Sequence, residues 1–92
     1  MAPSSVGSSG VGRGPSSVSE QIRDAIISSL PDAKVRVTPG SPGHFTIAVV
    51  AEEFRGKPRL ACQRLVYKAI TPLMAGERAP VHAVDSLETN PP

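Results

Sequence analysis

The sequence has no tryptophan, one cysteine, and only two phenylalanines and one tyrosine among its 92 residues. A single cysteine cannot form an internal disulfide, which excludes a disulfide-stapled scaffold and favours a reducing compartment. No apolar run approaches the ~18 to 20 residues that cross a bilayer, and the N-terminus lacks the apolar segment of a secretory signal. We therefore expect a soluble protein with no membrane partner and a modest aliphatic core.

The length and the scattered polar groups also argue against an enzyme. A chain of this size forms one small domain that buries only roughly 60% of the surface its unfolded form exposes, so a deep active site is not expected. No nucleophile has a base at a recognisable spacing, and apart from Glu52 and Glu53 the carboxylates occur singly. These features favour a binding module.

Composition divides the chain into a tail, a domain and a second short tail. Residues 1–17 are rich in Ser, Gly and Pro and contain no acidic residue, which predicts a disordered N-terminal tail or the remnant of an organellar transit peptide. Residues 18–87 carry the periodic apolar patterns of an ordered domain. Residues 88–92 are expected to fray as a disordered C-terminal tail.

Within the domain, apolar periodicity predicts the order helix, strand, strand, helix, strand. Ser17 and Glu20 have the spacing of a capping box at the first helix, and alternation places Phe45 on one strand face and His44 on the other. The expected ranges are 17–30, 34–38, 44–50, 58–75 (kinked or ended by Pro72) and 81–85. This order predicts an α/β fold, more narrowly α+β, with a three-stranded mixed sheet and both helices on one face.

The chain has two histidines, His44 and His82, and each lies in or beside a strand-like segment. Neutral imidazole is the commonest protein metal ligand, but a closed structural zinc site needs four ligands. The remaining thiol, Cys62, falls on the apolar stripe of a helix and is best interpreted as a buried small hydrophobe. The histidines are therefore either ordinary structural residues or half of a metal site completed by another molecule.

Five basic residues lie close together although the net charge is only +2, with no acidic residue between Glu53 and Glu77. They are Arg55, Lys57, Arg59, Arg64 and Lys68, here called the basic cluster. The cluster is either a solvated helix face or a surface that binds nucleic-acid phosphates or an acidic protein. Few aromatic residues are present to stack on bases, which disfavours nucleic acid.

The segments "GHFTIAVVAEEFRGKPRLACQRLVYKAI" and "VHAVDS" together resemble the BolA family, from about Ser19 to Ser86. The specific features are a His-Phe strand start, F-x-G-K, Q-R-x-V-Y and a late V-H-A. Where many members have Arg-His-Arg, this chain has Cys62, Gln63 and Arg64, and it lacks the usual C-terminal T-P-x-E-W. With glutamine at position 63, the helix motif is more similar to that of the IbaG-like and plastid-type branches of the family.

The resemblance implies a fold akin to class II KH domains and a non-enzymatic function. It implies a heterodimer with a monothiol glutaredoxin, in which a two-iron two-sulfur cluster is shared with glutathione, while the protein alone is a monomer. The V-H-A histidine maps to His82. The loop before the second strand, which in this family supplies a second His or Cys ligand, maps to "GSPGH" and hence to His44. The alternative is a KH-like nucleic-acid-binding regulator that uses the basic cluster. The compartment would be the cytoplasm in a bacterium, or a plastid or mitochondrion in a eukaryote.

Overall fold

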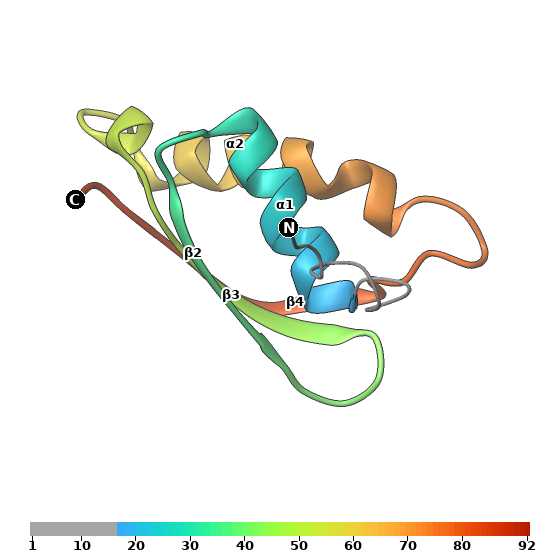
Figure 1. The fold of residues 1–92 in the computed structure, drawn as a ribbon. Helices are drawn as coiled ribbons and strands as arrows, with labels where there is room; N and C mark the ends of the chain where they lie inside the picture. Colours follow the sequence, from blue (N-terminus) through green and yellow to red (C-terminus); the bar gives the residue numbers. More distant parts are fainter. Residues whose placement is uncertain (1–16) are drawn as a thin grey trace, which may run out of the picture.

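In the computed structural model, which describes residues 17–92, two helices lie on one face of a three-stranded sheet (Figure 1). Along the chain the elements are α1 (Val18–Ser29), β2 (Lys34–Pro39), β3 (His44–Val50), the short 3-10 helix η2 (Glu52–Phe54), α2 (Arg59–Met74) and β4 (Ala83–Asn90). This confirms the predicted order and the α+β class. The predicted disordered tail at 1–17 lies outside the described residues except for Ser17.

The first helix begins at the capping box that the sequence predicts. The Ser17 hydroxyl accepts a hydrogen bond from the Glu20 backbone N–H at 3.1 Å, and the Glu20 carboxylate accepts one from the Ser17 N–H at 3.2 Å. Ile22 and Ile26, one turn apart, are fully buried. The box satisfies two backbone donors that a helix start otherwise leaves unpaired, so α1 starts at a defined residue.

The sheet has the order β2-β3-β4 and is mixed. The central strand β3 pairs antiparallel with β2 and parallel with β4, with Ile47 opposite Val37 on one side and Leu87 on the other. Phe45, Ile47 and Val49 are buried against the helices. Because side chains alternate along a strand, the other residues of β3, which include His44, lie on the open face.

One strand extends beyond its expected end, and the second helix is not ended by its proline. The strand β4 starts at Ala83 and runs to Asn90, so part of the expected tail at 88–92 is paired with β3, and His82 directly precedes the strand. The helix α2 continues through Pro72 to Met74. Pro72 lies in its last turn, where the missing N–H costs only one hydrogen bond near the end of the helix.

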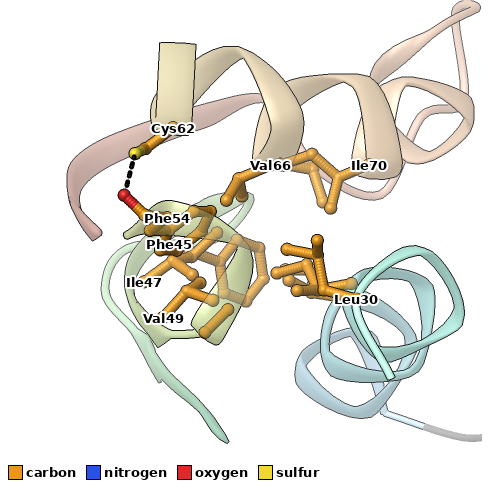
Figure 2. Packing of buried hydrophobic residues seen from close by; sticks show 12 residues of the cluster. Leu30, Phe45, Ile47, Val49, Phe54, Cys62, Val66 and Ile70 are labelled. Atoms are coloured by element: carbon orange, nitrogen blue, oxygen red, sulfur yellow. Dashed lines mark hydrogen bonds between the residues drawn. The ribbon is translucent and has the colours of Figure 1, made fainter. Parts of the chain in front are cut away.

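The core lies between the helices and the sheet and receives side chains from α1, β3, η2, α2 and the segment before β4 (Figure 2). It contains Ile22, Ile26, Leu30, Phe45, Ile47, Val49, Ala51, Phe54, Cys62, Val66, Ile70 and Val81. The Cys62 thiol is buried and lies 3.7 Å from the Phe54 carbonyl oxygen, which confirms its interpretation as a core residue. Within residues 17–92, no helix combines the length and apolar character needed to cross a membrane.

Candidate functional site

The fold brings the two histidines to the same end of the sheet. The Gly43 carbonyl oxygen, directly before His44, accepts hydrogen bonds from the N–H of His82 at 2.8 Å and of Ala83 at 3.1 Å. In the parallel pairing of β3 with β4, His44 lies opposite Ala83. Residues widely separated in the sequence therefore become neighbours, and we call His44 and His82 the histidine pair.

Gly43 leaves the space that the imidazole of His82 occupies. Its φ is +81°, a left-handed conformation that residues with a Cβ rarely adopt. A Cβ built on Gly43 would lie 2.1 Å from Cδ2 and 2.8 Å from Cγ of His82, so the ring packs directly over the glycine. Any other residue at position 43 would collide with His82, and the sequence alone did not indicate this role for the glycine.

His44 is held by its backbone and by its ring. Its N–H donates to the Ser41 carbonyl at 2.8 Å, and its own carbonyl accepts from the Gly40 N–H at 2.9 Å. Its Nδ1 lies 2.9 Å from Oδ1 of Asp85, although both side chains are partly exposed. The turn "PGSPG" at residues 39–43 therefore closes on His44 and defines its position.

The donors near the histidine pair are too few for a complete metal site. Across residues 17–92, no group of three or more His, Cys, Asp or Glu side chains is placed to hold a metal ion. Cys62 is not a candidate third ligand, because its thiol is buried in the core between the carbonyls of Phe54 and Lys57. A metal bound at these two imidazoles would therefore need further ligands from another molecule.

Two residues of the basic cluster, Arg55 and Lys57, lie in a turn at the other end of the domain. This turn follows η2, beyond the C-terminal end of β3, whereas His44 begins that strand (Figure 1). At roughly 3.3 Å per residue, the length of β3 separates the two ends by about 20 Å. The structure therefore does not bring the predicted metal ligands and this part of the basic cluster into one site.

Two members of the basic cluster are already engaged. Arg55 Nε donates to Glu52 Oε2 at 2.6 Å, and Lys57 Nζ donates to the Glu53 carbonyl oxygen at 2.7 Å. The hydrogen bond and charge of Arg55 lower the pKa of Glu52, and the same contact raises the pKa of Arg55. The exposed ion pair adds little stability, but it offsets the positive charge of this turn.

The other three members, Arg59, Arg64 and Lys68, are exposed along α2. Exposed aromatic surface is scarce beside them, since Tyr67 is 39% exposed while both phenylalanines are buried in the core. The face of α2 can thus contact phosphates or an acidic protein through charge, with a single ring available for stacking on a base.

The element order, the mixed sheet and the helices on one face define a small α+β domain of helix-strand-strand-helix-strand topology, with a histidine pair at one end. The model of the family described as BolA-like protein matches residues 26–91, which is most of the chain. The chain belongs to the BolA-like protein family.

Individual relatives agree with this assignment. The bovine protein described as BolA-like protein 1 is 46% identical over 48 residues, which cover 52% of this chain and about a third (33%) of that protein. A bolA protein homologue from Coxiella burnetii is similar in structure, with a TM-score of 0.68 and 30% identity over 84% of this chain and 94% of that one. BolA1 from Arabidopsis thaliana shares the fold, with a TM-score of 0.68 and 18% identity over 85% of this chain and 95% of that one.

Proposed function

We propose that this protein is a non-enzymatic partner of a monothiol glutaredoxin, and that the two share a two-iron two-sulfur cluster with glutathione. The observation that carries the proposal is the histidine pair, two imidazoles at one sheet end without a third metal ligand among residues 17–92. Imidazole suits iron, and histidine replaces cysteine on one iron of some two-iron two-sulfur clusters. A glutaredoxin cysteine and the glutathione thiol would supply the missing ligands.

Membership of the BolA-like family supports this proposal, as does the position of the pair. Both imidazoles lie at the edge of the domain, His82 exposed and His44 partly so, where a second protein can reach them. We expect the protein alone to be a monomer and the complex to be a heterodimer. Such a shared cluster would serve iron-sulfur cluster assembly and trafficking or the regulation of iron and redox state.

The proposal predicts that His82→Ala removes the shared cluster. Mixing the wild-type protein anaerobically with a monothiol glutaredoxin, glutathione, iron and sulfide should change the visible absorption and circular dichroism relative to glutaredoxin alone. In His82→Ala the spectrum should return to that of glutaredoxin alone, because one iron loses its imidazole ligand. Far-ultraviolet circular dichroism confirms that the variant is folded.

Glu88→Ala is the matched control, since Glu88 is exposed on β4 and lies opposite Ala48, away from the pair. It should leave the wild-type spectrum unchanged. A wild-type spectrum in His82→Ala would remove His82 from the site. A wild-type mixture identical to glutaredoxin alone would overturn the proposed function as a whole.

The alternative function, nucleic-acid binding, is favoured by one observation, the exposed Arg64 and Lys68 one turn apart on α2. It predicts a mobility shift with DNA or RNA at low salt that weakens steeply as salt rises, because neutralised phosphates release counterions. Arg64→Ala and Lys68→Ala should each reduce the slope of log affinity against log salt by about 0.9 if that side chain contacts a phosphate. The absence of a shift at low salt contradicts this alternative.

A further inference from the structure

Asp85 lies next to the histidine pair at an irregular point of the sheet. Phe45 is opposite Val84 and Thr46 is opposite Ser86, so Asp85 is an extra residue in β4, a β-bulge. Bulges bend a strand and re-aim side chains, and they occur often beside functional sites. This one accompanies an Asp85 carboxylate directed at His44, with 2.9 Å between Oδ1 and Nδ1.

The chemistry of the two groups sets the direction of this hydrogen bond. A carboxylate accepts hydrogen bonds and does not donate them, so Nδ1 of His44 must carry the proton. In a neutral imidazole the lone pair is then on Nε2, which is the atom left to bind a metal. Carboxylates that hold metal-binding histidines in this way fix the tautomer, orient the ring and raise its basicity as a ligand.

The two histidines are held by different means. The ring of His82 packs over Gly43, and among residues 17–92 no hydrogen bond to its ring nitrogens is found. The ring of His44 instead has a charged acceptor from the neighbouring strand. The carboxylate therefore acts selectively on one member of the pair.

We propose that Asp85 is a positioning residue that keeps His44 in the Nδ1–H tautomer and presents Nε2 as the ligating atom. The nature of the metal group rests on the proposed function, whereas the tautomer is a property of the protein alone. The strand register and bulge place Asp85 beside His44, so its part in the site does not require a partner molecule.

The tautomer is measured on the protein alone, at alkaline pH, by long-range proton–nitrogen correlation of ¹⁵N-labelled imidazoles. In the wild type, Nδ1 of His44 should be protonated and Nε2 should not. Asp85→Ala should shift the two nitrogen resonances of His44 toward each other as both tautomers become populated. Protonation at Nε2 in the wild type, or the same pattern in Asp85→Ala, overturns the proposal.

Glu88→Ala again serves as the control, because it removes an exposed carboxylate from β4 without touching the histidine pair. It should leave the His44 tautomer unchanged. Thermal unfolding of both variants measures any purely structural role of Asp85, which would change the midpoint without changing the tautomer. A His44 tautomer that changes equally in both variants counts against Asp85.

A second measurement uses the complex with glutaredoxin and glutathione. Loss of a carboxylate behind a metal-binding histidine typically weakens metal binding about 10- to 100-fold, so Asp85→Ala should lose its cluster to a chelator faster by a similar factor. An equal cluster lifetime despite a changed tautomer overturns the positioning role. If the wild-type complex forms no cluster, the proposed function fails while the tautomer result still decides what Asp85 does to His44.

Discussion

Gly43→Ala is expected to displace the imidazole of His82 and to abolish the cluster-dependent spectrum with glutaredoxin. The new Cβ would lie 2.1 Å from Cδ2 and 3.1 Å from Cβ of His82. Rotating the ring does not remove the second contact, so the segment carrying His82 must move. A further cost of about 1–2 kcal/mol comes from placing alanine at positive φ. Chemical shifts of His82 and denaturant unfolding measure the two effects.

Gly56→Ala is the control that separates the effect of backbone strain from the effect of the collision between the new Cβ and His82 in Gly43→Ala. Gly56 has a φ of +79°, nearly that of Gly43, but a Cβ there meets nothing within 4 Å. Gly56→Ala should therefore lose stability through strain alone and keep the His82 shifts and the spectrum. In the double variant Gly43→Ala with His82→Ala, part of the lost stability should return because the ring is absent. Unmoved His82 resonances in Gly43→Ala would contradict the packing of this ring over Gly43.

Phe54→Ala is expected to lower the free energy of unfolding by about 3–5 kcal/mol, the usual cost of removing a fully buried phenylalanine. Phe54 is 1% exposed and packs between the sheet and α2 (Figure 2). Small domains are stable by only about 5–15 kcal/mol, so this single change removes a large part of the total. Urea unfolding followed by circular dichroism gives the difference.

The single cysteine provides an independent measurement of the same effect. Cys62 is buried beside the Phe54 carbonyl, so a thiol reagent reaches it only when the domain opens. A loss of 3 kcal/mol should speed labelling about 100-fold, since each 1.4 kcal/mol is a factor of ten. Leu60→Ala, which truncates a side chain 56% exposed on α2, is the control and should change stability by less than about 0.5 kcal/mol. Equal labelling rates in both variants would contradict the role of Phe54 in the core.

Local sequence patterns predicted the helices and strands well, because the formation of a helix or a strand depends largely on residues close together in the sequence. The capping box of Ser17 and Glu20 placed the start of α1, and alternation placed Phe45 and His44 on opposite faces of β3. The predicted end of the last strand was wrong. Residues up to Asn90, which were expected to fray, pair with β3. Strand ends depend on the partner strand, and this information is absent from a local pattern.

The sequence by itself determined the element order, the buried position of Cys62 and the identity of the two histidines as candidate ligands, because these depend on composition and spacing. Only the tertiary structure decided that His82 packs over Gly43 and that Asp85 contacts His44. Both contacts join segments distant along the chain through the parallel pairing of β3 with β4 and its bulge. Register and bulges follow from packing of the whole sheet against the helices, and this packing sets which side chains meet.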